Sequence, residues 1–198
     1  MEFQEVLARR RMVRNYLAKA VDDEALERII AAARKAPSAG FSQGQSMLVV
    51  RSESTRRAIA QLAGEDEYVA DGFDPWISAA PVHVVVCISE QAYHDRYREP
   101  DKLDSESREI EWPIPYWWVD SGATMMLLLL AAVDEGLAAG FLGVHSVPGL
   151  RELLSIPEAV TPIGVVTIGH PAPDRRSGSL QRGWKSAAAV VHREKWQP

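Results

Sequence analysis

The chain has 198 residues, of which 46% are hydrophobic and 25% charged, and its formal net charge is −5. This length suits one well-cored domain and is short for two. The composition is typical of a soluble globular protein, and the acidic balance argues against general nucleic-acid binding, which needs a basic surface.

The single cysteine, Cys87, excludes an intrachain disulfide and fits a reducing compartment. It lies in an apolar run, where a thiol is inert rather than nucleophilic. The N-terminus lacks a basic start followed by an apolar core, so we expect no signal peptide. The longest apolar stretch, 123–133, is about half of what a membrane span needs. We therefore expect a cytoplasmic protein.

Apolar spacing predicts the elements of the first third of the chain. Asp22 or Asp23 is placed to cap the second helix, because a carboxylate accepts hydrogen bonds from free N-terminal amides. In order, the elements are a short amphipathic helix (2–10), an extended piece (15–21), a helix that ends before Pro37, a short strand (47–50) and a helix (54–63).

The strongest strand signal is 82–88, whose nearly continuous apolar residues indicate a strand covered on both faces. Residues 90–118 are rich in charge, proline and aromatic side chains, and predict a partly irregular excursion of a length typical of functional lids. After it we expect a helix (120–135) that is apolar all round and so buried on most sides, a strand (139–142), a helix (148–154), a strand (163–168) and a basic tail (172–198). This order predicts an α+β or α/β class in one layered domain covering 1–198.

Two segments carry most of the chemical information. Arg10, Arg11 and Arg14 lie where a helix gives way to extended chain, and their guanidinium groups suit a phosphate; the alternative is a solvated basic face. The second segment, 37–44, sets polar side chains beside two glycines, where backbone can approach a flat ligand. Its alternative is an ordinary polar connection.

With these segments in place, the chain resembles the flavin-dependent nitroreductase family. The markers run nearly end to end in the family's order: Arg10-Arg11-Met12-Val13-Arg14-Asn15-Tyr16; Pro37-Ser38-Ala39-Gly40-Phe41-Ser42-Gln43-Gly44-Gln45; Gly136-Leu137, 140–143 and then Leu153-Leu154-Ser155-Ile156-Pro157-Glu158; Ile168-Gly169-His170-Pro171; and a basic element before the tail, 182–196. The resemblance implies an α+β fold with a central, mostly antiparallel sheet flanked by helices, a long buried central helix, and a homodimer.

The resemblance also implies the cofactor FMN, bound between two subunits, with NAD(P)H as a transient reductant. The reaction would be ping-pong hydride transfer through the flavin N5 to a nitroaromatic, quinone or other conjugated acceptor. The tail, 172–198, would pack on the partner subunit. The matched cofactor-binding positions are Arg10, Arg11, Met12, Arg14, Pro37, Ser38, Ala39, Phe41, Gln43, Phe141, Leu142, Gly143, Arg182 and Lys185.

The chain departs from the family pattern at three places. Met12 stands where the family has a serine, Phe41 where it has an asparagine, and Gly44-Gln45 where it has Pro-Trp. The loss of the asparagine removes a polar contact to the flavin ring. These departures leave open a flavin-sequestering protein with little turnover, and a specialised biosynthetic or deazaflavin-using enzyme of the same fold.

The excursion and the histidines complete the sequence-based candidates. Trp112, Tyr116 and Trp117, together with Phe41, suit a lid that stacks on planar substrates; the alternative for the aromatic run is that it fills a hydrophobic gap or a dimer surface. His83 is expected to be structural. His145 is the one histidine to test as a proton donor, because it lies close to the turn expected to face the flavin. No catalytic side chain is otherwise assigned, because the flavin would supply the chemistry. The histidines and Cys87 do not cluster, so no metal site is predicted.

Overall fold

The computed structural model describes residues 1–175 and 177–196. Arg176 and residues 197–198, which belong to the predicted tail, lie outside the described residues. The helices are α1 (Phe3–Arg9), α2 (Asp23–Ala33), α3 (Glu53–Leu62), α4 (Glu65–Ala70), α5 (Trp76–Ala79), α6 (Gln91–Tyr97), α7 (Tyr116–Asp134) and α8 (Leu150–Leu153), with short 3₁₀ turns at Ala39–Phe41, Val144–Ser146, Gly178–Arg182 and Ala187–Ala189.

The strands of the described chain form one four-stranded sheet in the order β1-β2-β4-β3. Every pairing is antiparallel, as in Val82 opposite Ile168 and Ala138 opposite Gly169. The strands are β1 (Gln45–Val50), β2 (Val82–Ile88), β3 (Ala138–Gly143) and β4 (Thr161–Gly169). The predicted α+β class with an antiparallel sheet is confirmed.

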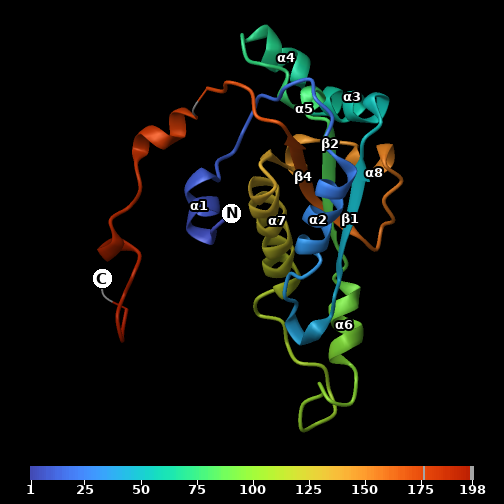
Figure 1. Ribbon diagram of the computed structural model, residues 1–198. Helices are drawn as coiled ribbons and strands as arrows, with labels where there is room; N and C mark the ends of the chain where they lie inside the picture. Colours follow the sequence, from blue (N-terminus) through green and yellow to red (C-terminus); the bar gives the residue numbers. More distant parts are fainter. Residues whose placement is uncertain (176, 197–198) are drawn as a thin grey trace.

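Helices cover both faces of this sheet (Figure 1). On one face α2 and α7 pack side by side against Val84 and Val86 of β2. On the other face α3, α5 and α8 pack against Val85 and Cys87. β2 is buried along its whole length, which explains its unbroken apolar sequence.

The second helix begins as the sequence predicts. The Asp22 carboxylate accepts a hydrogen bond from the Ala25 N–H at 3.0 Å, so Asp22 is the N-cap and Asp23 is the first helical residue. This satisfies one of the amide donors that a helix start leaves free.

The central helix differs from the expectation in two ways. It begins at Tyr116 rather than 120, because Trp117, Thr124 and Leu128 continue one buried stripe at helical spacing. It is also not buried on most sides. Val119 is 54% exposed and Met126 is 41% exposed on the other side of the helix. An apolar composition alone does not distinguish a helix buried in its own chain from one with an uncovered face.

The excursion is partly helical. α6 occupies its first part, and the described residues 98–115 then form no helix or strand before α7 begins. The helices α4 and α5 were not predicted, because they are short and lack a clear apolar period.

α7 is the one helix in the described part of the chain that is long and apolar enough to cross a membrane, judged by length and composition. The core helix of a globular protein passes the same test. In this chain α7 packs against α2 and the sheet, so it is a core helix of this kind.

Candidate functional site

A groove lies where the extended N-terminal segment meets β3. It consists of two adjoining cavities of about 400 and 380 Å³, both lined by Arg14 and Tyr68. The larger is also lined by Ala63, Glu65, Trp76, Ile77, Phe141, Leu142, Gly143, His145 and Ser146, and the smaller by Phe73, Asp74, Asp174, Arg175, Ser177 and Gly178. The groove thus brings Arg14 together with all three predicted residues of β3.

The N-terminal segment reaches the groove because it packs directly on β3. The Val13 N–H donates to the Ala139 carbonyl at 3.0 Å, and Met12 pairs with Ala139 in a parallel bridge. A Cβ on Gly140 would lie 2.5 Å from the Val13 carbonyl oxygen, so only glycine permits this approach.

Tyr16 fixes the end of the same segment. Its hydroxyl is buried and lies 2.8 Å from Thr167 Oγ1 and 3.1 Å from the Val13 carbonyl oxygen, to which it donates. Burial raises the pKa of the Tyr16 phenol, so it stays neutral. The segment therefore has a fixed register on the sheet, and this register positions Arg14.

The Arg14 guanidinium is placed to meet an anion or an acceptor oxygen. It lies 5.8 Å from the centroid of the Trp76 ring, and no carboxylate pairs with it in the described part of the chain. The Arg14 backbone N–H donates instead to Asp174 at 3.0 Å. A half-buried cation without a partner charge is a suitable ligand contact.

Trp76 is positioned by a buried carboxylate that the sequence analysis missed. Glu65 accepts hydrogen bonds from the Ile77 N–H at 2.5 Å and the Ser78 N–H at 3.1 Å, in the first turn of α5. The Glu65 carboxylate, at the start of α4, thereby satisfies two of the free amides at the start of α5. In the sequence, Pro75-Trp76 shortly before the buried strand β2 could have indicated the aromatic side of the groove. Nothing in the sequence indicated the role of Glu65.

Neither of the other arginines of the cluster is among the residues that line the groove. Arg11 lies 3.5 Å from the Asp174 carboxylate and lines a different cavity, with Arg9, Leu137 and Pro171. Arg10 is half-buried at the end of α1, and Met12 is 36% exposed. Alternation along an extended segment places Arg11 and Arg14 on opposite sides, and the two side chains line different cavities, so they do not act as one unit within the chain.

The turn at 37–44 is tightly held. The Ala39 N–H donates to the buried Asp120 carboxylate at 2.8 Å, and the Gln43 N–H donates to Ser38 Oγ at 3.0 Å. Gly40, Phe41 and Gln43 all have positive φ angles, of 61°, 58° and 52°. The left-handed region is costly for Phe41 and Gln43, and such strain is typical of functional sites.

Helix α6 holds this turn from outside. Arg96 Nε donates to the Gly40 carbonyl at 2.9 Å, and a Cβ on Gly40 would lie 2.6 Å from the Tyr97 ring. Phe41 is left 75% exposed at the tip of the turn. The turn is therefore held in one conformation, and the Phe41 ring at its tip is free to contact another molecule.

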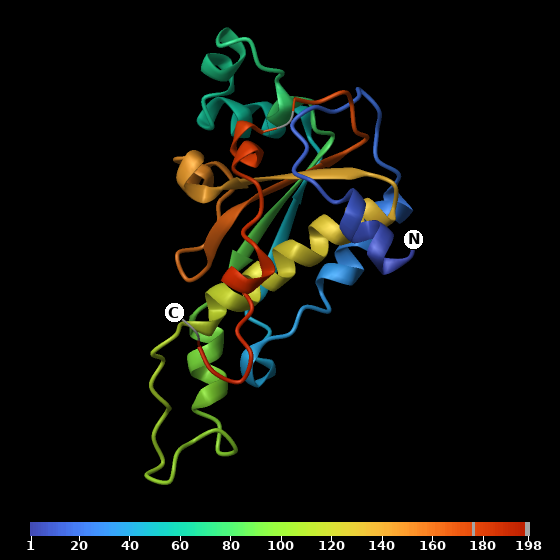
Figure 2. The same cartoon turned by 90° about the vertical axis from the view of Figure 1, so that its left-hand side faces the viewer.

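Within one chain the two halves of the predicted site lie far apart. The turn containing Ala39–Phe41 lies beside α6 at one end of α7, and the arginine-bearing segment lies near α4 and α5 at the other end (Figures 1 and 2). The chain alone does not bring Pro37, Ser38, Ala39, Phe41 or Gln43 to Arg14.

The aromatic run of the excursion is a packed cluster rather than an open lid. Trp117 is 6% exposed and packs with Ile88 and Tyr93, so its position favours the gap-filling interpretation over substrate contact. Trp112 is half-buried and donates from its indole N–H to Glu109 at 2.8 Å. Tyr116 is 44% exposed, so its ring lies at the surface of the chain.

The tail leaves the body of the chain. Arg182 and Lys185 are exposed, and the described apolar residues around them, including Trp184 at 93% exposure, contact little of their own chain. The tail extends beyond α1 in one view and crosses in front of α7 in the other (Figures 1 and 2).

The histidines and Cys87 occupy different environments. His83 is fully buried, its Nε2 lies 2.7 Å from the Ile77 carbonyl oxygen, and burial lowers its pKa to about 4, so it is structural. His145 is exposed and lines the groove. Burial raises the pKa of the Cys87 thiol to about 11, which keeps it unreactive. No group of metal-ligating side chains gathers among the described residues.

The groove combines the backbone edge of β3, the Trp76 ring and the Arg14 guanidinium, an arrangement that suits a flat ligand. Comparisons with known proteins identify the family. The Nitroreductase family model matches residues 7–170. A putative NADH dehydrogenase/NAD(P)H nitroreductase of Methanothermobacter thermautotrophicus is 30% identical, over 99% of this chain and 88% of its own. The FMN reductase (NAD(P)H) of Bacillus subtilis is 31% identical, over 93% and 70%.

Solved structures show the same likeness. The NADPH:FMN oxidoreductase of Vibrio harveyi, complexed with NAD⁺, has a TM-score of 0.75 and 25% identity, and covers 99% of this chain and 78% of that one. The chain belongs to the nitroreductase family, and it is an oxidoreductase of that family's fold.

Proposed function

We propose that this protein is an FMN-dependent NAD(P)H oxidoreductase that reduces nitroaromatic, quinone or other conjugated acceptors in a ping-pong cycle. The observation that carries the proposal is the groove, where the Arg14 guanidinium, the Trp76 ring and the edge of 141–143 converge. Relatives named as FMN reductase and NADPH-flavin oxidoreductase support the cofactor.

The residues present fit a flavin. The groove is partly apolar, and the Arg14 guanidinium has no carboxylate partner in the described chain, so it is free to meet an electronegative oxygen. FMN, when bound, supplies the hydride-transfer chemistry. No acid–base dyad is needed for that chemistry, which accounts for the lack of a convincing catalytic pair.

We propose that a complete site needs two copies of the chain. The turn with Phe41 lies at the far end of α7 from Arg14, so one subunit would supply Arg14 and 141–143, and its partner the turn. The exposed apolar residues of the tail and of α7 support such a homodimer, with the tail carrying Arg182 and Lys185 onto the partner.

In this arrangement the protein residues orient and shield. Arg14 would fix the flavin against β3, and Glu65 would hold Trp76 as the wall behind it. The strained turn would place Phe41 over the open face, where an aromatic ring selects planar acceptors by stacking. Closing this face excludes water, which strengthens the contact between Arg14 and negative charge on the ring.

The absorbance spectrum of the purified protein tests the proposal. We expect a yellow protein, or one that becomes yellow with FMN, and steady oxidation of NADPH in the presence of a quinone. A colourless protein that gains no flavin absorbance overturns it. Flavin binding without steady turnover identifies the sequestering alternative, and extraction of a deazaflavin identifies the specialised enzyme that Phe41 motivates.

A further inference from the structure

One face of helix α6 contacts the turn at 37–44 through three side chains. Tyr93, Arg96 and Tyr97 are spaced three and four residues apart, so they lie on the same side of the helix. Figure 1 shows α6 beside this turn, at one end of α7. Two departures from the family pattern, Phe41 and Gly44, belong to the same turn. The contacts of α6 are therefore made with the part of the turn that is particular to this chain.

The two glycines of the turn leave room for the tyrosine rings. A Cβ on Gly40 would lie 2.6 Å from the Tyr97 ring, and a Cβ on Gly44 would lie 2.7 Å from the Tyr93 ring. A larger residue at either position would have to push α6 away. The Tyr93 hydroxyl donates to Asp120 at 2.8 Å, and the same carboxylate oxygen accepts from a backbone N–H of the turn. The turn and α6 thus share one buried anchor on α7.

Arg96 joins the turn to the chain that follows α6. Its Nε donates to the Gly40 carbonyl at 2.9 Å, while Nη1 and Nη2 donate to the Asp101 carboxylate at 2.8 and 2.7 Å. Nη1 also donates to Glu99 at 2.9 Å. The side chain of Arg96 is 21% exposed, which limits competition from water. Because the guanidinium is planar and is bound along two of its edges, its orientation is fixed, and it fixes the Gly40 carbonyl in turn.

The conformation of the turn makes these contacts necessary. Phe41 and Gln43 have positive φ angles of 58° and 52°, which residues with side chains rarely adopt without support from their surroundings. The Phe41 ring is 75% exposed, so packing within its own chain does not hold it. Its direction is set by the backbone, and the Gly40 carbonyl is fixed directly before it.

We propose that Arg96 is a positioning residue that determines acceptor selectivity through Phe41. By fixing the Gly40 carbonyl, Arg96 holds the Phe41 ring in the orientation in which a planar conjugated acceptor stacks on it. The inference rests on the proposed function, since the turn of one subunit has to lie over the flavin of the other. Arg96 acts on the ring and not on the acceptor itself. An acceptor that does not stack, such as ferricyanide, gains nothing from this orientation.

Steady-state kinetics with two acceptors test this role in the flavin-loaded protein. We expect Arg96→Gln to lower kcat/KM for a naphthoquinone by about fivefold, mainly through KM, and to leave kcat/KM for ferricyanide unchanged. Phe41→Ala should produce the same difference between the acceptors. Because Arg96 acts through Phe41, the double variant should lose no more than Phe41→Ala alone.

Hydrogen–deuterium exchange tests the contact without any turnover. In the protein as purified, the backbone amides of 38–43 should exchange about tenfold faster in Arg96→Gln, because the Gly40 carbonyl loses a charged donor. Exchange in α2 should not change. Arg96→Lys keeps the charge but not the planar fork, so it should change both measurements in the same direction. It also keeps both tests valid if Arg96→Gln fails to fold.

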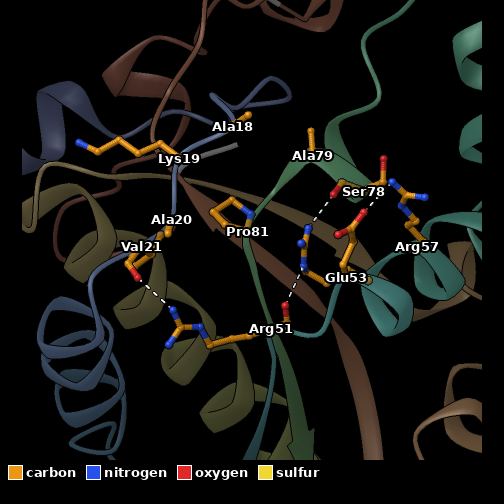
Figure 3. A pocket seen from close by; sticks show the side chains of 11 residues that line it. Ala18, Lys19, Ala20, Val21, Arg51, Glu53, Arg57, Ser78, Ala79 and Pro81 are labelled. Carbon is orange, nitrogen blue, oxygen red and sulfur yellow. Dashed lines mark hydrogen bonds and ion pairs between the residues drawn. The ribbon is translucent and has the colours of Figure 1, made fainter.

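Two other arginines provide matched controls. Arg98 lies directly after α6 and pairs with Glu109 rather than with the turn. Arg51 also binds one backbone carbonyl and one aspartate, those of Val21 and Asp23, but at a separate cavity of about 510 Å³ (Figure 3). Arg98→Gln and Arg51→Gln should leave unchanged both the ratio of the two kcat/KM values and the exchange of the turn.

Three kinetic results overturn the inference. They are an unchanged ratio in both variants of Arg96, equal losses with the two acceptors, and a change of the ratio in Arg98→Gln as large as in Arg96→Gln. Failure of the proposed function looks different, because the unchanged protein would then oxidise NADPH with neither acceptor. That result removes the role in selectivity as well, and the exchange measurement still decides whether Arg96 holds the turn.

Discussion

Arg14 is the cation that lines both cavities of the groove; it lies over the Trp76 ring, and no carboxylate pairs with its guanidinium in the described chain. Three arginines lie close together in the sequence, yet the structure gives them different surroundings. Arg11 lies beside Asp174, whereas Arg14 faces Trp76 and β3.

Arg14→Ala should therefore weaken FMN affinity by about 1.5–3 kcal/mol, because a hydrogen bond to a charged group is lost. Quenching of flavin fluorescence on titration measures the dissociation constant. Arg9→Ala is the matched control, since Arg9 is exposed, pairs with Glu5 and lies outside the groove. An unchanged dissociation constant in Arg14→Ala refutes its role.

Gly140 determines how closely the N-terminal segment packs. In Gly140→Ala the new methyl group would lie 2.5 Å from the Val13 carbonyl oxygen, so the segment must move. We expect a loss of about 1–3 kcal/mol in the free energy of unfolding, together with weaker flavin binding. Urea denaturation measures the first effect.

Gly122→Ala is the matched control in α7. Within one chain a Cβ there meets nothing within 4 Å, so at dilutions that keep the protein monomeric the substitution should stabilise the helix by up to about 1 kcal/mol. Equal changes in the free energy of unfolding for the two substitutions would show that the close approach at Gly140 does not determine stability.

At the scale of elements, α6 and the chain after it are joined by a charged network. His94 contacts Glu109 through Nδ1 and lies 3.4 Å from Glu90 through Nε2. Glu109 also accepts from Arg98 and from the Trp112 indole, at 2.9 and 2.8 Å. This network fixes the irregular chain that follows α6.

The network should make the excursion sensitive to pH. The hydrogen bond to Glu109 raises the pKa of His94 above its usual 6.5. A raised pKa means that protonated His94 stabilises the folded form at low pH, and that this contribution is lost as pH rises through the folded-state pKa. Protease cleavage within 98–115 should therefore be faster at about pH 8 than at about pH 6.

His94→Gln should remove most of this difference, because glutamine does not titrate. A cleavage rate that keeps the same pH dependence in His94→Gln contradicts the assignment. Bulk unfolding of both proteins must be compared at each pH, so that a local effect is separated from a global one.

At the scale of the whole molecule, the chain has more apolar surface than it covers. Val119 and Met126 on α7, and Leu180, Trp184 and Trp196 on the tail, are all exposed. Large exposed apolar groups gathered on a few elements mark interaction surfaces rather than ordinary surface. This distribution is the structural basis for the proposed homodimer.

Trp184→Ser should weaken dimerisation by about 2 kcal/mol or more, as expected for a buried interfacial tryptophan. The side chain is 93% exposed within its own chain, so a monomer would not be destabilised by the change. Sedimentation velocity over a concentration series measures the shift. Val69→Ser, at an exposed apolar position on α4, should leave the oligomeric state unchanged.

The sequence by itself determined the buried strand β2 and a carboxylate cap at Asp22 or Asp23, because these depend on local periodicity and on residues close together in the chain. The α+β fold and the family followed from the resemblance of motifs that run in order along the chain. It also identified Arg14, Phe141, Leu142 and Gly143, which the structure brings into one groove. It did not find Glu65, Trp76 or Asp174, whose roles depend on contacts between distant segments.

Only the tertiary structure decided how the predicted site is divided. It buried Trp117, separated Arg11 from Arg14, and placed the Phe41 turn at the far end of α7. Spacing along a chain fixes which residues share a face of one element. It does not fix which faces meet, because that depends on how α7 and the sheet pack, and here the packing leaves each half of the site open at opposite ends of the molecule.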